Sequence, residues 1–246
     1  MKGLRDLRDL VGVDRMLRET EMFDSIIKAV YEMAADEVYN YQETPNLSIY
    51  AYGSPGRREL VGGDSDADIF LVEKESNNKT KIFRLNLTDK LSKFNYSKID
   101  LPEWGDLNEV EIYLRNSLVE GNQVLETRFL TGSKDIDNKL SELKRLYNSP
   151  ERALKNIIFN RFYLNQYFKQ RIKDGAHNIK YCRGGSREFL FLSWYDDLDK
   201  MINGENKTKS KEPKVVTGLN RLLSNGKISV EQFNEAIEAI NFMTVL

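Results

Sequence analysis

The stretch that decides the fold is YGSPGRRELVGGDSDADIFLVEKE, residues 52–75. A β-branched and aromatic segment at residues 47–52 predicts a strand before it, and residues 66–73 predict a second strand within it. Residues two apart on a strand point to the same face, so Asp66 and Asp68 are expected side by side. Two adjacent carboxylates repel each other, and a divalent cation such as Mg²⁺ or Mn²⁺ removes that repulsion. The stretch therefore predicts a metal site directly against a buried strand.

The loop between the two strands suits the phosphates of a nucleotide. Gly53 lets the backbone approach a phosphate, and the Ser54 hydroxyl and nearby N–H groups are able to donate to its oxygens. Arg57 and Arg58 are predicted to reach a triphosphate. We interpret Asp64 as a loop residue.

A third carboxylate is expected from a neighbouring strand. Residues 95–102 predict a short strand that ends in Asp100. The rival interpretation of DSDAD is a solvated turn that leads into a strand. The Gly-Ser pair, the acids against a buried strand and Asp100 together favour a metal–nucleotide site.

The amino-acid composition excludes several classes of protein and of site. The chain has 246 residues, with 37 Lys and Arg against 38 Asp and Glu. This balance gives no reason to expect nucleic acid as a partner. Cys182 is the single cysteine and His177 the single histidine, so neither a disulfide within the chain nor a histidine-rich metal site is available. Without a signal-peptide core or a membrane-length apolar run, we expect a cytoplasmic protein with no membrane partner.

The periodicity predicts an α+β fold with a small mixed sheet followed by an all-helical domain. We expect residues 1–104 to form the core that carries the sheet and residues 105–246 to form the helical domain. In the predicted helix 81–94, Ile82, Leu85, Leu91 and Phe94 lie along one face. The aromatic series 159–168 is expected in the core. The remaining helices are predicted at residues 14–41, 106–131 (as two helices around Gly121, ending at Gly132), 133–147, 149–175, 184–202, 215–224 and 229–243.

Three blocks resemble a known family. They are GSPGRRELVGGDSDADIFLV (53–72), LETRFLTG (125–132) and NIKYCRGGSREFLFLSWY (178–195). Together they resemble the nucleotidyltransferase superfamily, whose fold is shared with DNA polymerase β. Within it they are similar to the nucleotidyltransferase region of the PII-protein uridylyltransferases. The first block is typical of the whole superfamily, and the third is much more specific.

The resemblance implies roles for named residues. Asp66 and Asp68 would bind the metal, with Asp100 as the third carboxylate, and Gly53 and Ser54 would contact phosphate. The third block supplies further residues that face the site, namely Lys180, Gly184, Gly185, Arg187 and Glu188. On spacing alone that block is equally well an ordinary helix cap with surface ions. We expect Arg128, in the second block, to form a buried structural ion pair.

By this resemblance the chain is a Mg²⁺-dependent enzyme of nitrogen regulation. A tyrosine hydroxyl of a PII-type protein would attack the α-phosphorus of UTP, and pyrophosphate would leave. The family's full-length members add HD hydrolase and ACT sensor domains, and one histidine cannot supply an HD site. We therefore expect transfer without removal, or else an excised or stand-alone domain of such an enzyme. The loop between Leu60 and Ser65 is also one residue longer than the family pattern.

Other functions stay open at this point. One alternative keeps the chemistry and changes the substrates, as in AMP transfer to another protein or transfer to a small molecule. Another is a non-catalytic nucleotide-sensing module that keeps the fold. Because Asp66, Asp68 and Asp100 are all acidic, we do not expect an inactive site.

Overall fold

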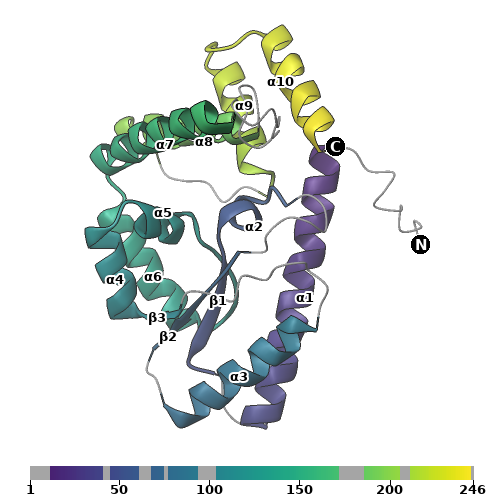
Figure 1. The fold of residues 1–246 in the computed structure, drawn as a ribbon, viewed down its shortest axis with the longest axis vertical. Helices are drawn as coiled ribbons and strands as arrows, with labels where there is room; N and C mark the ends of the chain where they lie inside the picture. Colours follow the sequence, from purple (N-terminus) through teal and green to yellow (C-terminus); the bar gives the residue numbers. More distant parts are fainter. Residues whose placement is uncertain are drawn as a thin grey trace, which may run out of the picture. The chain divides into compact units, whose positions relative to one another are not determined.

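The protein, studied as a computed structural model, has an α+β architecture (Figure 1), as the sequence predicts. The structure describes residues 12–40, 45–60, 68–74, 77–93, 104–171, 186–205 and 211–244. The elements follow one another as α1 (Val13–Tyr39), β1 (Leu47–Ala51), α2 (Gly53–Arg57), β2 (Ile69–Glu73), α3 (Asn78–Ser92), β3 (Trp104–Asp106), α4 (Leu107–Asn116), α5 (Val119–Glu126), β4 (Arg128–Gly132), α6 (Lys134–Tyr147), α7 (Pro150–Arg171), α8 (Ser186–Ile202), α9 (Lys214–Ser224) and α10 (Val230–Met243).

The described strands form one mixed sheet in the order β3-β2-β1-β4. β1 runs antiparallel to β2, with Tyr50 opposite Phe70, and antiparallel to β4, with Ala51 opposite Arg128. β2 runs parallel to β3. The small mixed sheet is thus confirmed, and β1 and β2, which flank the acidic stretch, are its central strands.

Alternation along β1 and β2 builds one apolar layer on each face of the sheet. Ile49 and Leu71 belong to a buried cluster with residues of α1 and α3, such as Phe83. Tyr50 and Phe70 belong to a second cluster with residues of α4, α5 and α6. Figure 1 shows α1 and α3 on one side of the strands and α4, α5 and α6 on the other.

The buried face of α3 differs from the predicted one. Thr80, Phe83, Leu87 and Leu91 are buried, whereas Ile82 and Leu85 are exposed. The sheet and α1 select the face because Phe83 packs edge-on against both Tyr31 and Tyr39. Of the predicted face only Leu91 is buried, and Phe94 lies outside the described residues.

The helices predicted over residues 106–131 end early: α5 stops at Glu126, and Arg128–Gly132 form strand β4 instead. Its side chains alternate between the two faces: Leu130 packs in the cluster with α1 and α3, and Phe129 against the cluster with α4 to α6. Gly132 has φ +117°, and a Cβ there would lie 2.4 Å from the Leu47 carbonyl oxygen. Pairing with β1 therefore overrides the local helical pattern.

The chain divides into two compact units. One contains Arg18–Asn148, and the other contains Ser149–Leu246 together with the chain up to Leu17. The division lies at residue 148 rather than at residue 104, because β4 pairs with β1 and keeps α4, α5 and α6 on the sheet. We refer to these parts as the sheet unit and the helical unit.

In the helical unit, α7 packs on α8 through Ile157 and Phe191, and Trp194 packs against them. The prediction that the aromatic series of α7 lies in the core is wrong for Phe159, Phe162 and Tyr163, which are exposed. Arg221 on α9 pairs with Asp196 and Asp199 of α8 and with Glu205. None of the helices that the structure describes has the length and apolar character needed to cross a membrane.

Candidate functional site

Gly53 and Asp68 meet where β1 ends and β2 begins. The Tyr52 N–H donates to the Asp68 carbonyl at 3.1 Å, which extends the β1–β2 ladder by one pair. Gly53 has φ +57°, and a Cβ on it would lie 2.0 Å from Asp68 Oδ2. The Asp68 carboxylate thus occupies the space that any side chain at position 53 would need. This close approach explains why glycine follows Tyr52.

Ser54 follows in the short helix α2 and is half-buried. Within the described part of the chain its hydroxyl makes no hydrogen bond, whereas its carbonyl accepts from the Glu59 N–H at 2.8 Å. The turn is closed by its own backbone, and the Ser54 hydroxyl is left for another partner.

Arg57 is held by two carboxylates. Its guanidinium donates to Glu59 at 2.8 Å and to Glu126, at the end of α5, at 2.9 Å, and the exposed fractions of the three side chains are 11%, 9% and 16%. Burial opposes the charge, but Glu59 and Glu126 outweigh it and raise the pKa of Arg57 above its ordinary value. This geometry gives Arg57 the position of a structural anchor for the loop.

Arg58 differs from its neighbour. It has a left-handed backbone (φ 62°) and ends α2, and its side chain is half-buried. Its Nε is buried without a hydrogen-bond partner, and the side chain makes no ion pair within the described residues. Burial and the nearby Arg128 lower the pKa of Arg58. Of the two arginines, Arg58 is the one whose charge is available to an anion.

The first two sequence blocks meet in space around this loop. Arg128 donates to both carboxylate oxygens of Asp24, at 2.7 and 2.8 Å, and to the Pro55 carbonyl at 2.9 Å. The ion pair predicted for Arg128 is therefore confirmed. A Cβ at Gly56 would lie 3.1 Å from the Glu126 carbonyl oxygen, so α2 is packed directly on the end of α5. Residues far apart in sequence together fix the Gly53–Ser54 turn.

The structure does not describe the side chains of the other candidate residues. Asp66, Asp100, Lys180, Gly184 and Gly185 lie outside the described residues. Arg187 and Glu188 are described only as backbone near the start of α8. Within the described ranges, no group of three Asp, Glu, His or Cys side chains lies close enough to hold a metal ion. Asp68 is thus the described member of the expected carboxylate set.

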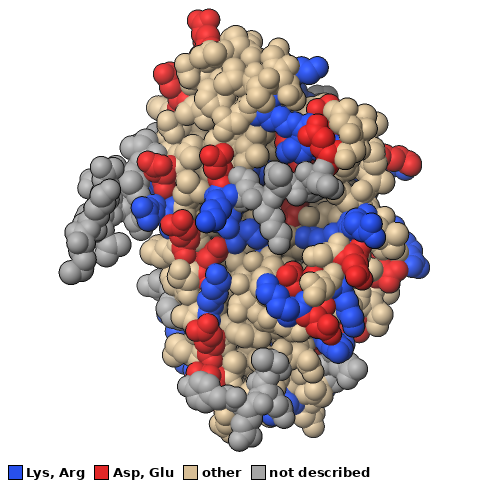
Figure 2. Space-filling view, turned by 180° about the vertical axis from the view of Figure 1, so that it is seen from behind, with Lys and Arg blue, Asp and Glu red and all other residues tan. Residues whose placement is uncertain are grey.

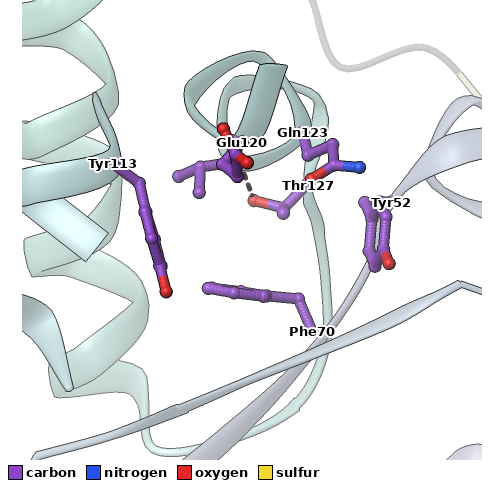
Figure 3. A pocket seen from close by; sticks show the side chains of 7 residues that line it. Tyr52, Phe70, Tyr113, Glu120, Gln123 and Thr127 are labelled. Atoms are coloured by element: carbon purple, nitrogen blue, oxygen red, sulfur yellow. Dashed lines mark hydrogen bonds between the residues drawn. The ribbon is translucent and has the colours of Figure 1, made fainter. Parts of the chain in front are cut away.

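A small pocket whose lining includes Tyr52, the strand partner of Asp68, was not predicted from the sequence. It is lined by Val124 and by Tyr52, Phe70, Tyr113, Glu120, Gln123 and Thr127, of which the last six are labelled in Figure 3. Tyr52 precedes Gly53, and Phe70 lies two residues after Asp68 on β2. The helical residues that complete the lining come from α4 and α5, and no motif marks them.

Charge on the surface is mixed. Figure 2 shows Lys and Arg side chains interspersed with Asp and Glu on the face that it draws. This agrees with the balanced composition of the chain. Neither a scan against protein-family models nor a search of curated proteins found a match for this chain.

Proposed function

We propose that the chain is a Mg²⁺-dependent nucleotidyltransferase of the polymerase β-like fold. By the sequence resemblance, it moves UMP from UTP to a protein hydroxyl, such as a tyrosine of a PII-type regulator. The observation that carries the proposal is the contact of the Asp68 carboxylate with Gly53, in the turn that presents Ser54. A carboxylate suited to binding a metal and a turn suited to binding phosphate thus lie together at one end of the sheet's central strands.

The donor set suits a hard cation. Carboxylate oxygens are the ligands that Mg²⁺ prefers, and it is usually held by one or two of them together with substrate phosphates. Gly53 leaves room for the Asp68 carboxylate where a side chain would displace it. Asp66 and Asp100 would complete the set. When bound, the metal would neutralise phosphate charge that develops during an in-line displacement.

The chain's own groups then have distinct tasks. The Ser54 hydroxyl donates to a phosphate oxygen, and Arg58 contributes a positive charge beside the loop. Arg57, through Glu59 and Glu126, keeps the turn in position. The acceptor oxygen forms a bond to the α-phosphorus while the bond to the pyrophosphate oxygen breaks, and a carboxylate accepts the hydroxyl proton. Catalysis rests mainly on positioning and charge neutralisation.

A labelling experiment tests the proposal. The purified chain is incubated with Mg²⁺, each of the four α-³²P-labelled NTPs and a lysate of the cognate cells as the acceptor pool. We expect one labelled protein band, and we expect it to disappear with the Asp66→Asn/Asp68→Asn variant. Intact nucleotide binding with no labelled protein would contradict protein nucleotidylation.

A further inference from the structure

We infer that the pocket lined by Tyr52 and Phe70 takes the flat ring of the donor's nucleobase and decides which NTP is used. The inference rests on the proposed function and adds to it the residues that select the base. The strand register places the pocket on the face of the sheet to which the Asp68 side chain belongs. Tyr50 lies opposite Phe70, and the Tyr52–Asp68 pair is the next same-face pair along the two strands. A nucleotide whose phosphates lie at Gly53 and Asp68 would thus have its base within reach of Tyr52 and Phe70.

The chemistry of the walls fits a heterocycle. Figure 3 shows the rings of Tyr113 and Tyr52 on opposite sides of the pocket, with Phe70 between them. Aromatic rings stack on any base, whereas an amide is able to both donate and accept at its edge. Gln123 supplies that amide. The Ser117 hydroxyl donates to Glu120 and holds the pKa of Glu120 below its ordinary value, so this carboxylate is an acceptor at neutral pH.

Some side chains that line the pocket are held in place, and others are able to change rotamer. Phe70, Val124 and Thr127 are buried, and the Thr127 hydroxyl donates to the Val124 carbonyl at 2.8 Å, the dashed line of Figure 3. Tyr113 and Gln123 are only half-buried, and within the described part of the chain their side chains make no hydrogen bond. The cavity is about 10 Å³, room for one water molecule, so binding of a base requires Tyr113 and Gln123 to turn outward. Such rotamer changes are common on binding.

Equilibrium binding to the full chain tests the inference. The probes are ATP, UTP, GTP, CTP and inorganic triphosphate, each with Mg²⁺, measured by calorimetry. We expect the wild type to rank the four NTPs clearly. Tyr113→Ala should reduce the ratio between the best and the worst NTP by at least about fivefold, which is the lower end of one aromatic–base contact. Affinity for inorganic triphosphate should stay within about twofold of the wild type, because the phosphates bind elsewhere.

Two further variants keep the result interpretable. Gln123→Met preserves the side-chain volume, removes the amide and should also weaken the ranking. Ile112→Ala alters an exposed neighbour on the same helix that does not line the pocket and should leave the ranking unchanged. If Tyr113→Ala and Gln123→Met both keep the wild-type ranking, the inference is wrong while the transferase proposal stands. If the wild type binds no NTP, the proposed function itself fails.

Discussion

At the scale of single residues, the Gly53–Ser54 turn depends on two exact requirements, a left-handed glycine and a buried arginine. The sequence alone predicted that Gly53 and Asp68 serve one site, because both flank neighbouring strands. It did not distinguish Arg57 from Arg58, since the partner that separates them, Glu126, is 69 residues from Arg57 in the chain. Adjacent residues of one type look alike until their long-range contacts are known.

Gly53→Ala should cost more than an ordinary left-handed glycine. The backbone conformation alone costs about 1–2 kcal/mol, and the added Cβ also displaces the Asp68 carboxylate. Gly226→Ala is the matched control, because Gly226 has φ +64° with nothing within 4 Å of an added Cβ. Urea denaturation and Mg²⁺-dependent nucleotide binding should show the larger loss of stability, and the loss of binding, only for Gly53→Ala. Equal losses of stability with unchanged binding would refute the role of the contact.

Arg57→Met and Arg58→Met should separate stability from binding. Arg57→Met leaves two buried carboxylates without their cation and should lower the free energy of unfolding by about 3–5 kcal/mol. Arg58→Met removes no ion pair among the described residues and should change it by less than about 1 kcal/mol. The same Arg58→Met variant should weaken Mg²⁺–NTP binding about tenfold. Chemical denaturation and calorimetry measure the two effects, and the reverse pattern would exchange the roles we assign.

At the scale of elements, β4 shows what local pattern cannot decide. RFLTG is five residues long, and either a helix end or a strand accommodates it; pairing with β1 selects the strand. The bounds of α1, α6, α9 and α10 were predicted to within about two residues, because their periodicity extends over several turns. The face of α3 was not, because its apolar residues surround the helix and the neighbours select which of them are buried.

The Asp24–Arg128 pair should couple α1 to β4 measurably. The two-point contact is largely shielded, with 21% and 13% of the side chains exposed. A double-mutant cycle with Asp24→Ala and Arg128→Ala should give a coupling free energy of about 1–3 kcal/mol. Arg18 and Glu21 on the same helix are 3.6 Å apart but far more exposed, and their cycle should give less than about 1 kcal/mol. Similar values for both pairs would show that Arg128 does not anchor β4.

At the scale of the whole molecule, the chain forms a sheet unit that carries Gly53, Ser54 and Asp68 and a helical unit held by its own apolar and ionic contacts. The sequence predicted that two such parts exist. It missed their border, because the return of β4 to β1 is a long-range pairing that composition does not reveal. The two tryptophans of the chain fall one in each unit, Trp104 on β3 and Trp194 on α8.

Arg221→Met should destabilise the helical unit selectively. Arg221 contacts Asp196, whose side chain is only 5% exposed, and its removal leaves that carboxylate with Lys200 as its cation among the described residues. We expect a loss of about 2 kcal/mol, typical of a hydrogen bond to a charged group. Fluorescence-monitored unfolding of Arg221→Met in a Trp104→Phe background, which reports Trp194, should show the shift. In a Trp194→Phe background the Trp104 signal should shift less; equal shifts would mean that the units unfold together.

The activity that we propose for this chain is transfer of the α-phosphoryl group of an NTP together with its nucleoside. The most direct measurement compares protein labelling from two equimolar NTP mixtures, one labelled with ³²P at the α-phosphate and one at the γ-phosphate, in the presence of Mg²⁺. We predict label from the α-position only, its loss in Asp68→Asn, and its retention in Asp89→Asn, which changes an exposed acid on α3. Label from the γ-position, or α-label that persists in Asp68→Asn, would contradict the account.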